Sequence, residues 1–377
     1  MSKSVVYFRG MNALRFFAAS LVVFHHAEQI RIKNDLFNLK LFSFFNNGGI
    51  AVTFFFVLSG FLITYLLLKE KFFSGSISIK KFYYRRILRI WPLYFLLVFL
   101  GTLLIPFLIS FFHIPYEMPY AFSDVIMYYV FFAPFMVTPL FGHHLLEPLW
   151  SIGVEELFYI FWAPLVKFVK VSITKVAFSV ILIKGVLVFA SHYFFQDVIF
   201  ITVLRQLQFE SMAVGALGAV WVFHNHEKAY ASFFLFNRFS QMVLFSFVFI
   251  RLFFVDYLVE YSPFFSAIHD TFAFHLCMNF LFLWLLLNVS MNVNSIIRLE
   301  GRVLNFLGEI SYGIYMYHMI VIFSVVLFFR DFLAGIDNIS ATFIFYFFVF
   351  SGTILVSYLS KRFFEDYFLN LKSKYRV

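Results

Sequence analysis

The chain has 377 residues, of which 62% are hydrophobic and only 13% are charged. Soluble globular domains are closer to half apolar and a quarter charged, so this composition excludes a large soluble protein and indicates a polytopic membrane protein. The net charge of +9 does not indicate a nucleic-acid partner, because the basic residues of membrane proteins gather in cytoplasmic loops. The lipid bilayer is therefore the first expected partner, and nucleic acid is not expected.

The first apolar segment, residues 9–27, contains an arginine and two adjacent histidines. Arg15 and His26 are eleven residues apart. In an α-helix this spacing is close to three turns, so both side chains share one face and are roughly 16 Å apart along the axis. The side chain of His25 points about 100° away from that face. Ionisable residues in a membrane span are costly and usually face the bundle interior, so we predict that this face is functional.

Further apolar segments are long enough to cross a bilayer, which takes about 20 residues. They are residues 50–68, 90–112, 150–169, 176–194, 207–223, 239–256, 271–289, 306–328 and 342–360.

The apolar stretch 122–141 is ambiguous because Pro134 and Pro139 interrupt it. If it does not cross, the lysines within 167–175 lie on the same side as the basic segment 69–89, as the positive-inside rule requires. We therefore predict that 122–141 belongs to a loop on the outer face.

These segments predict an all-α bundle of about ten transmembrane helices with cytoplasmic N- and C-termini. We expect a single membrane domain over residues 1–377, without an appended soluble domain. The sequence contains no His, Asp or Glu cluster with metal-ligand spacing, so no metal site is expected.

Several motifs follow one another from the first predicted helix to the last. They are Arg15 with His26; Phe55–Ile63 (FFVLSGFLI); Arg86-Ile-Leu-Arg89 with Trp91-Pro-Leu-Tyr94; Leu149–Tyr159 (LWSIGVEELFY); Ile310–His318 (ISYGIYMYH); and Phe364-Glu365. In this order and spacing they resemble the motifs of acyltransferase family 3, bacterial integral-membrane enzymes that modify surface sugars.

The resemblance implies a multi-pass enzyme of the bacterial inner (cytoplasmic) membrane. Such an enzyme would be an O-acyltransferase, most often an O-acetyltransferase, and would take its acyl group from cytoplasmic acyl-coenzyme A. The acceptor would be a hydroxyl of a surface polysaccharide or a lipid-linked glycan on the outer face.

His26 is the candidate catalytic base. A sugar hydroxyl is a poor nucleophile at neutral pH, and an imidazole can take its proton as the hydroxyl attacks the thioester. An acyl-imidazole intermediate is equally compatible with the sequence. Glu155 lies near the outer end of its predicted helix, on the same side of the membrane as His26. We expect it to orient the imidazole or to stabilise its charge. The alternative for His26 is an interfacial histidine without a catalytic role.

Three arginines are candidate ligands of the coenzyme A phosphates. Arg86 and Arg89 are spaced i, i+3 and share a helix face, where they could clamp phosphate with paired donors. Arg15 would approach the donor from the cytoplasmic half of the first helix. The alternatives are ordinary topogenic charge for Arg86 and Arg89, and pairing with a buried carboxylate for Arg15.

The remaining candidates are expected to contact the substrate. Trp150 and Ser151 could frame the acceptor sugar, although an interfacial tryptophan is often only an anchor. Tyr312 and His318 lie in the late motif, where a buried histidine could also be hydrogen-bonded packing.

Two other functions are compatible with the sequence. A transporter or flippase could line its substrate pathway with the same buried charges, but paired broken helices in inverted repeats, which would favour transport, are not apparent. An enzyme using another donor, such as succinyl-coenzyme A, would need an additional cationic residue.

Overall fold

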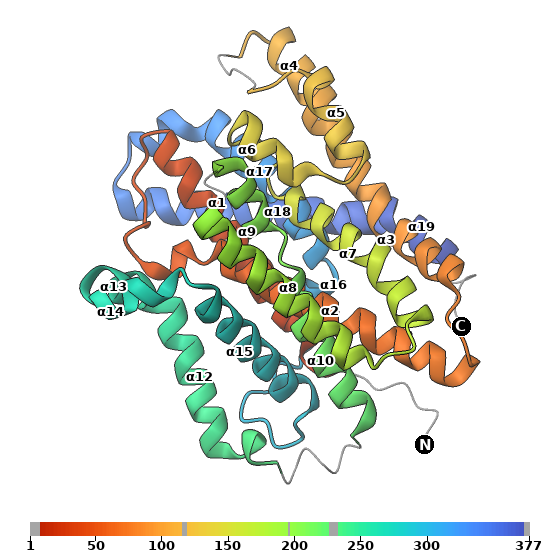
Figure 1. Cartoon of the computed structure of the whole chain (residues 1–377). Helices are drawn as coiled ribbons and strands as arrows, with labels where there is room; N and C mark the ends of the chain where they lie inside the picture. Colours follow the sequence, from red (N-terminus) through yellow and green to blue (C-terminus); the bar gives the residue numbers. More distant parts are fainter. Residues whose placement is uncertain (1–7, 115–118, 195–196, 226–232, 373–377) are drawn as a thin grey trace. The chain divides into compact units, whose positions relative to one another are not determined.

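The computed structural model describes residues 8–114, 119–194, 197–225 and 233–372, and all regular elements in these ranges are helical (Figure 1). The chain divides into two compact units. Unit 1 comprises Met1–Glu28, Leu39–Tyr65 and Ser211–Tyr312. Unit 2 comprises Gln29–Asn38, Leu66–Glu210 and Gly313–Val377.

The prediction of an all-α polytopic membrane protein is confirmed. In the described part of the chain, eight helical stretches are long and apolar enough to cross a membrane. They are Gly48–Ser74, Ile79–Phe111, Leu149–Phe168, Ile173–Phe194, Val198–His224, Phe272–Met291, Ser311–Ala334 and Asn338–Leu371. The bent pair α12 (Arg238–Phe253) and α13 (Val255–Tyr261) would make a ninth.

The first predicted span is also a helix, α1 (Met11–Lys33), so each of the ten predicted ranges overlaps a helix. The predicted range 306–328 begins in a separate short helix, α16 (Arg302–Glu309), and continues in α17 (Ser311–Ala334). Both chain ends lie outside the described residues, and their cytoplasmic location stays a prediction.

The ambiguous stretch 122–141 forms short elements. These are α5 (Phe122–Val130), the 3₁₀ turn η3 (Pro134–Met136) and α6 (Val137–Phe141). None of them is long enough to cross a bilayer, in keeping with the expected loop.

A close helix crossing in unit 1 depends on two glycines. Gly60 of α2 (Gly48–Ser74) and Gly215 of α10 (Phe209–His224) each face the backbone of the other helix. A Cβ added at Gly60 would lie 2.0 Å from the carbonyl oxygen of Met212, and one added at Gly215 would lie 2.0 Å from that of Val57. Small residues permit such approaches between membrane helices, so these glycines set the distance between α2 and α10.

The bend between α12 and α13 in unit 1 is 70° and occurs without proline or glycine. Side chains from η1 (Ser43–Asn46) and the residue after it bind the broken helix. The guanidinium of Arg251 donates to the side-chain oxygen of Asn47 at 2.8 Å, and the amide of Asn47 donates to the carbonyl of Leu252 at 2.9 Å. The backbone amide of Asp256 donates to the hydroxyl of Ser43. The bend is therefore held by tertiary hydrogen bonds.

After the bend the chain continues through α14 (Pro263–His269) into α15 (Phe272–Met291). Helix α15 packs beside α12 (Figure 1).

Unit 2 contains α3 (Ile79–Phe99), which continues through the π-helical turn η2 (Leu100–Leu104) into α4 (Ile105–Phe111). It also contains α7, α8 and α9 (Leu149–Phe168, Ile173–Phe194 and Val198–Gln206), α18 (Asn338–Ser360), η5 (Lys361–Glu365) and α19 (Asp366–Lys372). Nearly all of α17 (Ser311–Ala334) belongs to this unit. The C-terminal helix α19 packs against α3 (Figure 1).

A buried lysine connects three elements of unit 2. The ammonium group of Lys184, in the middle of α8, donates to the carbonyls of Leu204 and Leu207 at the end of α9, the latter at 2.8 Å. It also lies 3.6 Å from the carboxylate of Glu210. The ammonium satisfies carbonyls that the last turn of α9 leaves without helical partners, and this accounts for a charge in the middle of a span.

Candidate functional site

Arg15 and His26 both lie on the continuous helix α1, which confirms the local structure on which their predicted common face depends. Their separation along the axis is roughly 16 Å by helix geometry. Both residues are half-buried, as is Tyr312, which also belongs to unit 1.

The neighbouring His25 lies against the start of α2. A Cβ added at Gly48 would be 2.5 Å from Cδ2 of the His25 ring, so the glycine makes room for the imidazole. The rings of His25 and His26 are 5.4 Å apart at their centroids. The structure thus gives His25 a packing contact with α2.

Three arginines on one turn of α3 in unit 2 have different surroundings. Arg85 forms a salt bridge of 2.8 Å with Glu70, a buried carboxylate that also accepts from the backbone amide of Ser78. Arg86 and Arg89 form no hydrogen bond and no salt bridge with the residues that the structure describes. Arg85 thus stabilises the fold, while the guanidinium donors of the two motif arginines are available to a ligand.

Arg86 is held by an aromatic ring and by nearby carboxylates. Its guanidinium carbon lies 5.5 Å from the ring centroid of Tyr159 on α7, a cation–π distance. It interacts electrostatically with Glu155 and Glu156, and Arg89 does so with Glu365. These carboxylates compensate part of the positive charge without occupying the guanidinium donors.

Glu155 and Glu156 on α7 differ in burial and in partners. Glu155 is half-buried and accepts a hydrogen bond of 2.8 Å from the hydroxyl of Tyr159. Glu156 is buried, and its Oε2 accepts from the indole N–H of Trp91 at 3.1 Å. Its Oε1 has no hydrogen-bond partner among the described residues. Glu156 was not among the candidates from the sequence, and the Trp91 that binds it belongs to the paired-arginine motif.

The structure places Ser151 in a buried hydrogen-bond group. Its hydroxyl lies 2.7 Å from the hydroxyl of Tyr315, which donates to the carbonyl of Pro148 at 2.9 Å. Trp150, the next residue back, is half-buried in the first turn of α7. The imidazole of His318 is fully buried, with Nδ1 2.6 Å from the carbonyl of Tyr315. These contacts account for Ser151 and His318 as packing residues, and a substrate contact stays a prediction.

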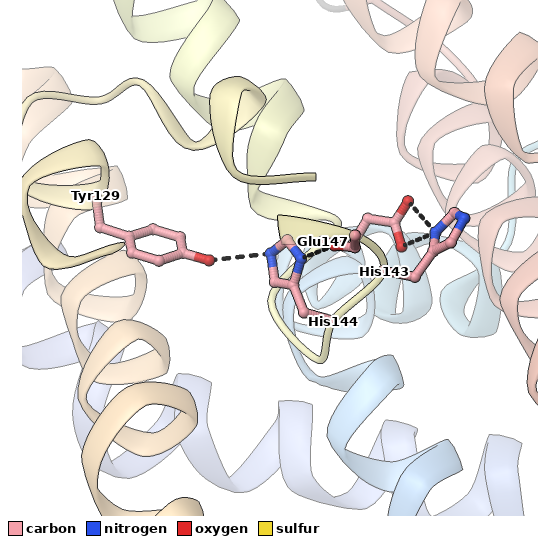
Figure 2. Close-up of polar contacts among 5 residues, drawn as sticks. Tyr129, His143, His144 and Glu147 are labelled. Atoms are coloured by element: carbon pink, nitrogen blue, oxygen red, sulfur yellow. Dashed lines mark hydrogen bonds and ion pairs between the residues drawn. The ribbon is translucent and has the colours of Figure 1, made fainter. Parts of the chain in front are cut away.

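The loop before α7 carries two adjacent histidines with opposite environments (Figure 2). The imidazole of His143 is exposed and lies 2.8 Å from the carboxylate of Glu147. The hydrogen bond with that carboxylate, and its charge, raise the pKa of His143. His144 is buried, and this burial lowers its pKa.

Two hydrogen bonds hold the ring of the buried histidine. Nδ1 of His144 donates to the carbonyl of Gly142 at 3.0 Å, and Nε2 then accepts from the hydroxyl of Tyr129 at 3.1 Å (Figure 2). Gly142 itself has φ +87°, a conformation that favours glycine. A neutral His144 therefore fixes the loop, and His143 is left at its surface.

A cavity of about 580 Å³ lies within unit 2 beside this loop. Its walls come mainly from the end of α1, from the loop and from the second half of α17, and Ile114 adds one contact from the chain just after α4. The lining residues are Gln29, Ile30, Lys33, Asn34, Ile114, His143, His144, Leu145, Glu147, Met319, Phe323, Val326, Leu327, Phe328, Arg330 and Asp331. The sequence reasoning named none of them as candidates, because only the fold brings the three segments together.

The candidates fall into two groups. Unit 1 contains Arg15, His26 and Tyr312, and unit 2 contains Arg86, Arg89, Trp150, Ser151, Glu155 and His318. Unit 2 brings Arg86 close to Glu155, whereas Ser151 and His318 belong to the buried environment of Tyr315. Within the described ranges, no group of three or more His, Cys, Asp or Glu residues could hold a metal ion.

Comparison with known proteins adds the family. A Staphylococcus aureus (strain COL) protein, provisionally named an O-acetyltransferase, is 28% identical over 186 residues, which are 46% of this chain and 27% of that protein. Bacillus subtilis (strain 168) YrhL, provisionally named a peptidoglycan O-acetyltransferase, is 30% identical over 41% of this chain and 23% of its own length. The peptidoglycan O-acetyltransferase OatA of Listeria monocytogenes is 28% identical over 48% of this chain and 28% of its own length.

The matched part is thus about a quarter of the length of these curated relatives. No solved structure gives a significant match. The model of the acyltransferase 3 family, described as an acyltransferase domain, matches residues 8–362. The chain, a multi-pass membrane protein, belongs to the acyltransferase 3 family.

Proposed function

We propose that this protein is a membrane O-acyltransferase, an O-acetyltransferase in the first instance, of the bacterial inner membrane. It takes the acyl group from cytoplasmic acyl-coenzyme A and transfers it to a hydroxyl of a surface polysaccharide or lipid-linked glycan on the outer face. Family membership supports acyl transfer, and the names of the relatives support an O-acetyl product on a glycan.

The observation that carries the donor assignment is the pair of arginines on α3. Arg86 and Arg89 keep their guanidinium donors without hydrogen-bond acceptors among the described residues, whereas the adjacent Arg85 is bound to Glu70. Guanidinium groups spaced i, i+3 suit the oxygens of a phosphate or diphosphate. The phosphates of coenzyme A provide such oxygens, and Arg15 is proposed as a third cationic contact.

His26 is proposed as the base of the transfer. The acceptor hydroxyl attacks the thioester carbonyl as the imidazole takes its proton, and the C–S bond breaks to release coenzyme A. The protonated imidazole can then return the proton to the leaving thiolate. If His26 is instead the nucleophile, it displaces the coenzyme A thiolate to form an acyl-imidazole, and the acceptor hydroxyl then attacks this intermediate, loses its proton and regenerates the imidazole. Glu155 is proposed to orient or charge-stabilise the imidazole.

A transporter or flippase is the second candidate function, and one observation bears on it. The bent pair α12 and α13 is a broken helix, a feature that transporters use in inverted pairs. It is the one bent pair among the described helices that passes the length and composition test, and its break is held by Asn47 and Ser43. A single bend without a counterpart favours group transfer.

The donor assignment is tested by acetyl-coenzyme A binding to the purified protein in nanodiscs. Replacing one charge-assisted contact to phosphate costs about 10-fold or more in affinity, so Arg86→Gln and Arg89→Gln should each weaken binding by at least this factor. Lys80→Gln, which removes an exposed cation from the first turn of the same helix, is the matched control and should leave binding unchanged. Equal affinity of all four proteins would refute the phosphate assignment. Binding without any acyl release by the wild type would favour a transporter.

A further inference from the structure

The cavity in unit 2 combines a polar wall with an apolar wall. The end of α1 and the loop before α7 provide amide, carboxylate and imidazole groups, including those of Asn34, His143 and Glu147. The face of α17 provides Phe323 and Leu327. A volume of about 580 Å³ lies in the range of small-molecule sites, which run from roughly 300 to 1,000 Å³. A sugar ring is likewise polar at its edge, where it carries hydroxyls, and apolar on its face, where it carries C–H groups.

Positive charge exceeds negative charge in this cavity when His143 is protonated. The cations are Lys33, His143 and Arg330, and the carboxylates are Glu147 and Asp331. Glu147 is already paired with His143 at 2.8 Å. Asp331 is 97% exposed and lies 3.4 Å from Arg330, and such an exposed pair contributes little. Neither carboxylate therefore neutralises the remaining cations effectively.

The two remaining cations retain unused donors. The ammonium of Lys33 forms no hydrogen bond or ion pair with the described residues. Arg330 donates through Nε to the carbonyl of Asn34 at 3.2 Å and through one terminal nitrogen to Asp331. Its other terminal nitrogen is not engaged in the described part of the chain. The bond to Asn34 ties the guanidinium to the residue that follows Lys33 in the chain, and both cations line the same cavity.

We infer that this cavity binds an acidic sugar residue of the acceptor glycan, with the sugar's anionic group between Lys33 and Arg330 and its ring against the α17 wall. The inference rests on the proposed function, which supplies the glycan acceptor. It adds that the acceptor carries a carboxylate or a phosphate. An anionic lipid head group would need the same cations, so the test below includes a lipid as competitor.

The test compares two disaccharides that differ in one group, a carboxylate in the acidic sugar and a hydroxymethyl group in the neutral one. Binding of cellobiouronic acid and of cellobiose is measured on the purified full-length protein in phosphatidylcholine nanodiscs, without acetyl-coenzyme A. The wild type should bind the acidic sugar about 10-fold or more tightly, because a charge-assisted contact is absent from the neutral one. This preference should decrease as salt is added, since the contacts are solvent-accessible.

Lys33→Gln and Arg330→Gln should each remove most of the preference for the acidic sugar. Lys175→Gln and Arg205→Gln, which remove exposed cations of unit 2 that do not line the cavity, are the matched controls and should retain it. All four changes are at the surface, and unfolding curves verify that the variants fold. Equal affinity of the wild type for both sugars, or an equal loss in the Lys175→Gln control, would overturn the inference. Loss of acidic-sugar binding when the protein is placed in phosphatidylglycerol nanodiscs would identify a lipid site instead. This result would also overturn the inference.

The two proposals fail in different ways. Acyl release from acetyl-coenzyme A reports on the transfer chemistry, and sugar binding without donor reports on the cavity. If acyl release is absent while the charge preference is present, the cavity inference stands as a binding site and the proposed function is wrong. If acyl transfer occurs but the wild type does not distinguish the two sugars, only the cavity inference is wrong.

Discussion

The hydrogen bond between Tyr129 and His144 fixes the loop that forms one wall of the cavity, and Tyr129→Phe tests this directly. The change removes the hydroxyl that donates to Nε2 of His144 at 3.1 Å and keeps the ring. Tyr129 is 0% exposed and His144 4% exposed, so water cannot replace the lost donor. Leaving a buried acceptor unsatisfied costs about 1–3 kcal/mol, and we expect the free energy of unfolding to fall by this amount.

A double-mutant cycle with His144→Phe assigns the loss to this contact. Unfolding is followed in mixed micelles at pH 8, where the lowered pKa keeps His144 neutral. The two changes should be less than additive by about 0.5–1.5 kcal/mol, because each one removes the same bond. Because the loop lines the cavity, Tyr129→Phe should also weaken binding of the acidic disaccharide. A Tyr129→Phe protein as stable as the wild type, or a strictly additive cycle, would refute the reasoning.

Three further changes test the loop and the packing. The methyl group of Gly142→Ala would have no neighbour within 4 Å, so only the backbone conformation, φ +87°, opposes the change. We expect the free energy of unfolding to fall by about 1–3 kcal/mol, and an unchanged unfolding curve would contradict this. Gly215→Ala forces a methyl group to 2.0 Å from the carbonyl oxygen of Val57 and should lower the stability of the protein by about 1–3 kcal/mol or more. The amount of folded protein in membranes measures this loss. The raised pKa of His143 means that its pairing with Glu147 stabilises the fold below about pH 6.5 and loses this effect as pH rises through the folded pKa. His143→Gln should therefore cost roughly 0.2–1 kcal/mol at pH 5.5 and less at pH 9, and the opposite trend would contradict this.

The helices were predictable because each span carries its own signal in a continuous apolar sequence. The interruption of 122–141 by Pro134 and Pro139, together with the charge distribution, was enough to set that stretch apart, and it forms only short elements. The bend after Phe253 was not predictable, because no proline or glycine marks it. Its cause lies about 200 residues away in sequence, where Asn47 binds Arg251.

The candidate site was predictable only in part. Motif spacing identified Arg86 and Arg89, but the sequence could not show that the adjacent Arg85 is bound to Glu70, which lies on another helix. The hydrogen bond of Glu156 was not predictable either, since its partner Trp91 is 65 residues away. The cavity depends on three segments that are far apart in the chain, so its charge balance exists only in the folded protein.

The central claim is that His26 takes the proton of the acceptor, and transfer of a labelled acetyl group from acetyl-coenzyme A tests it most directly. Membranes that contain the wild type, His26→Ala or His25→Ala are compared at equal amounts of folded protein. Loss of a general base costs about 10²- to 10⁴-fold, so His26→Ala should lose transfer by this factor. His25→Ala should retain transfer, because His25 packs against Gly48 of α2. Equal transfer by His26→Ala and the wild type, or loss of transfer in His25→Ala alone, would contradict the account.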